Sequence, residues 1–417
     1  MSADHRNQLN GAVFLASQFG LIILSIPAFV PRPLQVVAFA LLGWYLFQVI
    51  SIQTTGDFNA DFGLGSAIIV QFLLALGYAF LTPPEKLKDF QDKCTTSVAE
   101  RPLGQRVLWT LKLFSNPRGI GWAHEPSYLP PRPSPSTPRS TFVISRILLA
   151  AGCFSIVSIS HYFVDTYVAF VTADLLVTGA PFRWRVSAVF NFAIGGICML
   201  SGLNATISAA VVGCGFSVPE RWPHLFGSPL QIWSIRRVWR RFWHQMIRQV
   251  CIYRLMSETV HTDFTCVLQS VLTCTSALLG RVVSDKHIGT TSYKLARLYI
   301  AFSISGLVHA GGDLMATGKL GSKSLTFFML QPLGISVEIV VSRLWSRLQG
   351  GPMKSRGKNL VERNSSDKYH GAAEDSIPPL WIRCVGFIWV ALWMVWSGAY
   401  IVDALYAARL AANFGRV

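Results

Sequence analysis

Charged residues are scarce in this chain. Asp, Glu, Lys and Arg together make up 14% of its 417 residues, whereas soluble domains carry about 25%. Hydrophobic residues reach 51%, and the mean hydropathy is +0.41. This composition excludes an ordinary soluble protein. It predicts an all-α, polytopic transmembrane protein, because a helix satisfies its own backbone hydrogen bonds in lipid.

Paired cysteine motifs and acidic residues are also lacking. The eight cysteines form no CxxC pair, and most lie in apolar segments, where cysteine behaves as a small hydrophobe. Neither a disulfide framework nor a metal site is therefore expected. The 21 acidic residues against 37 basic ones give a net charge of +16. Because the positive charge gathers in loops between apolar runs, the expected partner is the lipid bilayer and not a nucleic acid.

Apolar runs long enough to cross a bilayer, which takes roughly 20 residues, recur along the chain. The qualifying runs are Gly11 to Val30, Leu34 to Ile52, Phe62 to Leu81, Thr141 to Ser160, Val186 to Cys214, Ala296 to Ala316, Leu325 to Val341 and Trp381 to Leu405. Two more runs, His161 to Ala180 and Phe264 to Gly280, are ambiguous, so about eight to ten membrane segments are expected. The first run lacks the basic start of a signal peptide and is interpreted as a retained helix.

Three basic loops interrupt these runs, at Pro83 to Arg139, Ser217 to Arg254 and Ser342 to Ile377. We expect residues 83–140 and 342–380 to be polar, flexible loops within one integral-membrane domain that covers residues 1–417. If all three loops face the cytosol, an even number of crossings separates them. Both termini would then lie in the lumen, and neither ambiguous run would cross the membrane.

A Trp- and Arg-rich block occupies Ser234 to Cys251. At 100° per residue its aromatic side chains fall on one side of a helix and its arginines on much of the rest, which predicts an amphipathic helix at the membrane interface. Such a helix is either an anchor for anionic headgroups or part of a site. His244, beside two tryptophans, favours a site, because an apolar surround keeps an imidazole neutral and able to accept a proton.

A lone histidine, His309, lies inside the apolar run Leu298 to Ala310. An ionisable side chain in a membrane helix costs a few kcal/mol and is by default a functional hypothesis. The alternative is a packing residue bonded to a backbone carbonyl.

Four ordered motifs resemble those of the wax synthase-like branch of membrane-bound O-acyltransferases. The third resembles the signature of this branch, and the second resembles the stretch that precedes the signature. The four motifs are Asn116-Pro-Arg-Gly-Ile-Gly-Trp122, Pro219-Glu-Arg-Trp-Pro-x-Leu-Phe-Gly227, Ser234-Ile-Arg-x-x-Trp-x-x-x-Trp-His-Gln245 and Ser305-Gly-Leu-Val-His309. The first is similar to a motif of fungal members, and the last matches the apolar helix that carries the family's near-universal histidine.

The resemblance implies transfer of an acyl group from acyl-CoA, a co-substrate and not a bound cofactor, to a hydroxyl. The reaction needs a base for the hydroxyl proton and donors for the developing oxyanion. His309 is the candidate base, and His244 either orients the acyl donor or donates to the oxyanion. Gly306 would leave room for a substrate. The residues expected to contact acyl-CoA or the acceptor are Arg236, Trp239, Trp243, Gln245, Ser305 and Gly306.

Polar residues after His309 are further candidates. Asp313 lies four residues on, on the same helical face, so it either orients the imidazole or marks a solvated helix end after Gly311 and Gly312. Glu338 lies within an apolar run, where a carboxylate needs a partner.

The expected activity is acetyl transfer from acetyl-CoA to a lipophilic secondary metabolite such as a terpenoid or meroterpenoid, in the endoplasmic reticulum, as the resemblance to fungal members implies. A long-chain acyl-CoA:fatty alcohol wax ester synthase is the alternative within the family. A transporter would show paired inverted halves, which are not evident. An integral-membrane terpene cyclase would use acidic residues, and Asp165, Asp174 and Glu338 form no recognisable motif.

Overall fold

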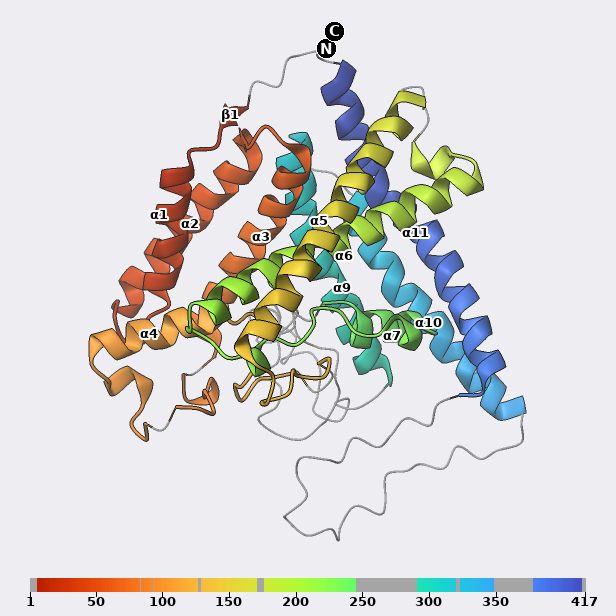
Figure 1. The fold of residues 1–417 in the computed structure, drawn as a ribbon. Coiled ribbons are helices and arrows are strands. Elements are labelled where there is room, and N and C mark those ends of the chain that lie inside the picture. Colours follow the sequence, from red (N-terminus) through yellow and green to blue (C-terminus); the bar gives the residue numbers. More distant parts are fainter. Residues whose placement is uncertain are drawn as a thin grey trace.

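The computed structural model of the chain describes residues 6–82, 84–92, 94–126, 129–170, 176–244, 291–319, 323–348 and 378–414. Within these residues the fold is a bundle of long apolar helices (Figure 1). The helices are α1 (Gly11–Leu24), α2 (Arg32–Ile52), α3 (Phe58–Leu76), α5 (Arg139–Phe170), α6 (Phe182–Gly213), α9 (Thr291–Thr317), α10 (Lys323–Leu348) and α11 (Leu380–Phe414). The all-α polytopic fold is thus confirmed.

Seven of these helices are long and apolar enough to cross a membrane, and α1, with 14 residues, is shorter. Among the described residues this gives eight apolar helices, the lower end of the expected number. One ambiguous run is corrected: α5 continues from Arg139 through Phe170 without a break, so residues 161–170 extend this helix and do not form a separate interfacial segment. The other run, Phe264 to Gly280, lies outside the described residues.

The helices alternate in direction between two ends of the bundle. The short parallel strands β1 (Asn7–Gln8) and β2 (Gln53–Thr54) pair at the end where α11 finishes (Figure 1). The connections that leave α3, α6 and α10 start at the opposite end, which we call the loop end. All three basic loops therefore start at the same end of the bundle, which agrees with the even number of crossings between them that the charge bias predicts. The side of the membrane on which the loop end lies stays a prediction.

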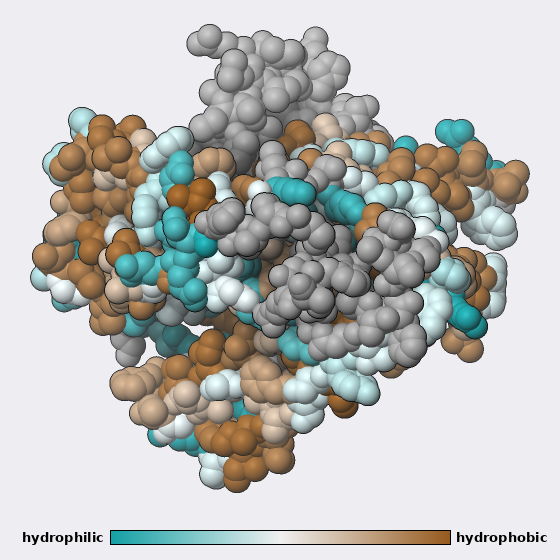
Figure 2. Space-filling model, turned by 90° about the horizontal axis from the view of Figure 1, so that it is seen from above, coloured by the Kyte–Doolittle hydropathy of each residue, from teal (hydrophilic) through white to brown (hydrophobic). Residues whose placement is uncertain are grey.

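The outer surfaces of the helices are apolar. Large apolar side chains are exposed along α2, α5, α6 and α11, among them Leu41, Leu148, Ile207 and Ile388. Seen along the bundle, brown apolar residues form most of the rim, and hydrophilic residues lie nearer the middle of the view (Figure 2). Such a surface suits contact with lipid tails.

The first basic loop is folded, which corrects the expectation of a flexible segment. It contains η2 (Pro84–Lys86), η3 (Val98–Glu100) and α4 (Leu103–Phe114). Its own small core consists of Leu87, Val98, Trp109, Leu113 and Trp122. These side chains bury enough apolar surface to hold the segment together. Of the third loop, α10 continues to Leu348 and α11 begins at Leu380, while residues 349–377 lie outside the described part of the chain.

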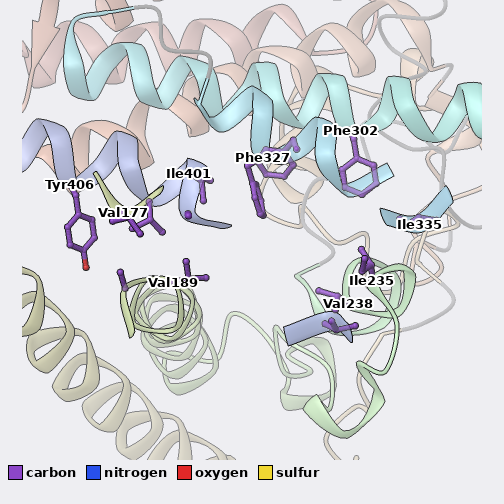
Figure 3. Packing of buried hydrophobic residues seen from close by; sticks show 14 of the residues in the cluster. Val177, Val189, Ile235, Val238, Phe302, Phe327, Ile335, Ile401 and Tyr406 are labelled. Carbon is purple, nitrogen blue, oxygen red and sulfur yellow. The ribbon is translucent and has the colours of Figure 1, made fainter. Parts of the chain in front are cut away.

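The main core lies between α6, α9, α10 and α11 and the short elements α7 (Ile235–Arg237) and η7 (Val238–Phe242, a π-helical turn). In Figure 3, Ile235 and Val238 lie in the same cluster as Phe302, Phe327 and Ile335. Residues Ser234–His244, which we call the signature segment, therefore fold into the bundle from the loop end.

Candidate active site

His309 lies on α9 between two phenylalanine rings. The imidazole stacks on Phe328 of α10 at a centroid distance of 4.7 Å and an interplanar angle of 4°, and on Phe62 of α3 at 5.9 Å and 18°. The side chain is half-buried. Because aromatic rings of both α3 and α10 stack on the imidazole, its plane is fixed before any substrate binds.

The hydroxyl of Ser66 on α3 contacts the same imidazole, with 3.4 Å between Ser66 Oγ and His309 Nδ1. Ser66 Oγ donates its own proton to the carbonyl of Phe62, at 2.9 Å. The hydroxyl is then free to accept a proton from Nδ1, which leaves the lone pair on Nε2. This tautomer is the one in which Nε2 can take a proton from a substrate.

Glycines bring α3 and α9 close enough for this contact. A Cβ at Gly312 would lie 2.4 Å from Ser66 Oγ and 2.5 Å from the carbonyl oxygen of Phe62, and one at Gly65 would lie 2.6 Å from the carbonyl of Gly311. Small residues at helix interfaces allow backbones to approach in this way. Gly311 and Gly312 therefore serve packing and do not break α9, which continues to Thr317.

The signature segment is short and irregular, not a continuous amphipathic helix. Ser234 Oγ accepts from the backbone N–H of Arg237 and caps α7, and the helical backbone ends after η7, where Trp243 is extended. The aromatic side faces protein and not lipid. Trp239 packs edge-on against Phe302 at 5.5 Å and Phe327 at 6.1 Å. The signature segment thus packs into the core. The two histidines can act together only if it does so.

Gln331 on α10 fixes Trp239 and was not predicted as a site residue. Its Oε1 accepts from Trp239 Nε1 at 3.4 Å, and its Nε2 donates to Ser397 Oγ at 3.2 Å and to the carbonyl of Phe327 at 2.9 Å. The side chain is fully buried. A buried amide with these partners defines the rotamers of the groups around it.

Glu338 anchors the start of the segment. Its carboxylate accepts from the backbone N–H of Ile235 at 2.6 Å, from that of Arg236 at 3.4 Å and from Trp389 Nε1 at 3.1 Å. A carboxylate at the first N–H groups of a helical turn satisfies donors that have no partner within the turn. The partner that this carboxylate needs is therefore the signature segment itself.

A series of ring contacts connects His309 to His244. It runs through Phe328, Trp239 and Trp243, with centroid distances of 4.7, 5.8, 5.7 and 5.4 Å from one pair to the next. His244 Nδ1 is buried and makes no hydrogen bond with the described residues. Burial lowers the pKa of His244 to about 3, and electrostatic interactions with His309 and Arg118 lower it further. His244 is therefore a neutral imidazole at pH 7.

Asp313 does not orient His309, and it does not mark a solvated end. It is 1% exposed and accepts from the backbone N–H of Ser324 at 3.1 Å and from Ser324 Oγ at 2.9 Å. Ser324 lies in the first turn of α10, where backbone N–H groups lack partners within the helix. Asp313 therefore connects the end of α9 to the start of α10.

The remaining predicted contacts are placed as follows. Gly306 faces Leu325, whose Cδ1 would lie 2.6 Å from a Cβ added there, so the expected space for a substrate is filled by α10. Ser305 Oγ donates to the carbonyl of Ala301 in its own helix. Arg236 is exposed at the loop end, and Trp243 packs on Phe226 at 5.5 Å. Gln245 lies outside the described residues.

The first two motifs of the sequence contact each other. Arg118 is 4% exposed, and its guanidinium donates to the carbonyls of Pro223 at 3.2 Å and His224 at 2.9 Å. Arg146 of α5 donates to the carbonyl of Trp222. The folded first loop and α5 thus hold the chain that leads into the signature segment.

Comparison with known proteins matches residues 222–330 to the model of the Membrane bound O-acyl transferase family, a range that contains both histidines. The acetyltransferase ple2 of Rhodocybe pseudopiperita is 25% identical over 381 residues, which cover 88% of this chain and 85% of that protein. The acetyltransferase eriL of Hericium erinaceus is 27% identical, covering 87% of this chain and 82% of that protein.

A third relative, the O-Mevalon transferase macI of Penicillium terrestre, is 28% identical over 284 residues, which cover 62% of this chain and 59% of that protein. No solved structure matches the chain significantly.

Proposed function

We propose that this chain, which belongs to the membrane-bound O-acyltransferase family and is an O-acyltransferase, moves an acetyl group from acetyl-CoA to a hydroxyl of a lipophilic secondary metabolite such as a terpenoid or meroterpenoid. The names of its fungal relatives support acetyl as the acyl group. The apolar bundle around His309 suits an acceptor that partitions into the membrane, and we place the protein in the endoplasmic reticulum.

The observation that carries this proposal is the fixed imidazole of His309, stacked between two rings and in contact with Ser66 through Nδ1. Nε2 takes the proton of the acceptor hydroxyl as its oxygen attacks the thioester carbonyl carbon. The C–S bond then breaks, and the proton passes from Nε2 to the thiolate of coenzyme A. General base catalysis of this kind contributes about 10²–10⁴-fold.

His244 is the second polar group of the site. A neutral imidazole with an N–H can donate a hydrogen bond to the oxyanion, and it adds no competing positive charge near His309. The aromatic rings between the two histidines exclude water, which strengthens such a hydrogen bond. We assign oxyanion stabilisation to His244, with donor positioning by the tryptophans beside it.

The test uses microsomes that contain the wild type, His309→Ala or His161→Ala. The third protein is the matched control, because His161 is a half-buried histidine on α5. Each receives labelled acetyl-CoA or palmitoyl-CoA with a panel of terpenoid alcohols and a fatty alcohol. We expect acetyl esters of a terpenoid from the wild type and His161→Ala, and a loss of about 10²–10⁴-fold in His309→Ala.

Other outcomes of that assay would change the proposal. Ester formed from palmitoyl-CoA and the fatty alcohol would keep the mechanism and replace the substrates with those of a wax ester synthase. Full activity in His309→Ala would show that His309 is not the general base of the reaction.

A further inference from the structure

A basic pocket lies at the loop end, beside the signature segment. Its volume is about 290 Å³, at the small end of ligand pockets. It is lined by Ser228, Leu230, Gln231, Trp233, Arg237, Arg241 and Arg383. Of the described residues that line it, three are arginines and none is acidic.

The arginines reach the pocket from two elements that are far apart in the sequence. Arg237 and Arg241 come from α7 and η7, and Arg383 comes from the first turn of α11. The ring of Trp233 lies between two of them, 4.0 Å from Arg237 Cζ and 4.9 Å from Arg383 Cζ. The tryptophan therefore holds two guanidinium groups beside the same pocket through cation–π contacts.

Arg383 has hydrogen-bonding capacity that the described residues do not use. One terminal nitrogen donates to the carbonyl of Leu230 at 3.4 Å, while Nε is buried and has no partner among the described residues. A guanidinium presents its N–H groups in a planar fork that matches the oxygens of phosphate. An oxyanion in the pocket would supply acceptors to this fork.

The pocket lies at the level of a membrane boundary. Arg383 is in the first turn of the span Leu380–Asp403, and Leu380 and Trp381 of that turn are 70% and 60% exposed. Exposed tryptophan at the end of a span is typical of the headgroup level of a bilayer. Phosphate groups of lipids are found at this depth, and a nucleotide that approaches the bundle from the water would reach it too.

The pocket and the candidate active site lie on different sides of the same segment. Ile235, Val238 and Trp239 face the core, whereas Arg237 and Arg241 line the pocket. Gly386 of α11 allows this arrangement, because a Cβ there would lie 2.2 Å from the carbonyl oxygen of Trp233. An anion bound between α11 and the signature segment would therefore stabilise the position of Arg237 and Arg241, while Glu338 binds the N–H groups at the start of the segment.

We propose that this pocket binds a phosphate group, carried by an anionic phospholipid or by the nucleotide end of coenzyme A. The guanidinium groups of Arg237, Arg241 and Arg383 bind the phosphate oxygens, and Trp233 keeps two of them in place. The phospholipid source is independent of the proposed function, and the nucleotide source depends on it.

The experiment compares unfolding temperatures of the purified full-length protein, so that it does not depend on activity. The proteins are the wild type, Arg383→Gln, Arg241→Gln and Arg347→Gln. The last is the control, because Arg347 is an exposed arginine in the last turn of α10 and does not line the pocket. Arg241→Gln keeps the Trp233–Arg383 contact and covers the case in which Arg383→Gln folds poorly.

Two pairs of probes separate the sources. The first pair is nanodiscs of phosphatidylcholine with or without phosphatidic acid, and the second is coenzyme A and 3′-dephospho-coenzyme A in neutral nanodiscs. We expect at least one pair to give a shift in the wild type and Arg347→Gln that is lost in both pocket variants. Loss of a charge-assisted hydrogen bond corresponds to roughly tenfold weaker binding or more.

A shift with phosphatidic acid identifies the lipid source, and a larger shift with coenzyme A than with its dephospho form identifies the nucleotide. Equal responses of the pocket variants and Arg347→Gln to both pairs of probes would overturn the proposal. That outcome would leave the acyl-transfer reaction of His309 untouched.

Discussion

His309 and His244 belong to one series of aromatic contacts, but different structures hold them. His309 lies within the 27-residue helix α9 and is held by α3 and α10. His244 follows a five-residue π-helical turn, and its position depends on contacts of Glu338 and Gln331 with residues earlier in the segment. The bundle thus fixes the orientation of one histidine directly, while that of the other depends on how the signature segment is anchored.

Among the residues that hold the two histidines in place, the largest effect should come from forcing α3 and α9 apart. In Gly312→Ala the new Cβ would meet Ser66 Oγ and the Phe62 carbonyl, and overpacking of this kind costs about 1–3 kcal/mol. A displacement of a catalytic group by about 1 Å lowers the rate by roughly 100-fold. We expect kcat to fall by about that factor in Gly312→Ala.

The matched control is Gly63→Ala on α3, where a new Cβ meets no atom within 4 Å. Ester formation and the unfolding temperature of both variants should be measured together. Equal kcat in the two variants would show that the close approach of α3 and α9 does not set the geometry of His309.

The second effect concerns the anchor of the other histidine. Glu338→Ala leaves the N–H groups of Ile235 and Arg236 and the indole N–H of Trp389 without their acceptor. Each unsatisfied buried donor costs about 1–3 kcal/mol. We expect kcat/KM to fall by about tenfold to 100-fold, and Glu338→Gln, which keeps one acceptor oxygen, to lie between Glu338→Ala and the wild type.

The readout that separates anchoring from general destabilisation is the accessibility of the end of the signature segment next to His244, where Trp243 packs on Trp239 and His244. If Glu338 positions the segment, the reactivity of a single cysteine engineered at Trp243 toward a soluble thiol reagent should rise in Glu338→Ala. Unchanged labelling and unchanged kcat/KM would refute the anchoring role.

A smaller effect should follow from Ser66→Ala, which removes the acceptor for His309 Nδ1 while both ring stacks remain. One hydrogen bond of this kind contributes about 1 kcal/mol, so kcat should fall roughly fivefold. Ser303→Ala on α9 is the control, because its hydroxyl bonds to the Tyr299 carbonyl and Met329 and not to His309. If both variants keep full kcat, the tautomer does not depend on Ser66.

The sequence predicts the membrane helices well. It predicts poorly the contacts between helices that hold the site residues in place. The run Leu34 to Ile52 became α2 (Arg32–Ile52), because the length and apolarity of a span are local properties. Ser66 and His309 are 243 residues apart, and Trp239 and Gln331 are 92 apart. Such contacts depend on which helices become neighbours, and no periodicity within one segment contains that information.

Two wrong predictions have the same origin. Asp313 shares a helical face with His309, but the start of α10 folds back to offer it the two donors of Ser324. The sequence predicts a polar, flexible first loop. Its tryptophans, Trp109 and Trp122, are 13 positions apart in sequence and pack at 5.6 Å. In both cases a contact formed across a turn of the chain, beyond the reach of the periodicity of one helix, decided the outcome.

The last effect concerns stability rather than kcat, and it is expected from the titration of His244. Burial lowers its pKa to about 3, whereas an unfolded chain has the ordinary value of 6.5. Between these two values the unfolded state binds the proton and the folded state does not. The stability that this group contributes is therefore complete above pH 6.5 and is lost as the pH falls toward 3.

When the pH falls from about 7 to about 5, the unfolding temperature of the wild type should therefore fall further than that of His244→Gln. The difference between the two curves isolates His244, because the carboxylates titrate in both proteins. Parallel curves would mean that His244 takes up a proton freely in the folded state, and the contrast between a fixed base and a neutral second histidine would then fail.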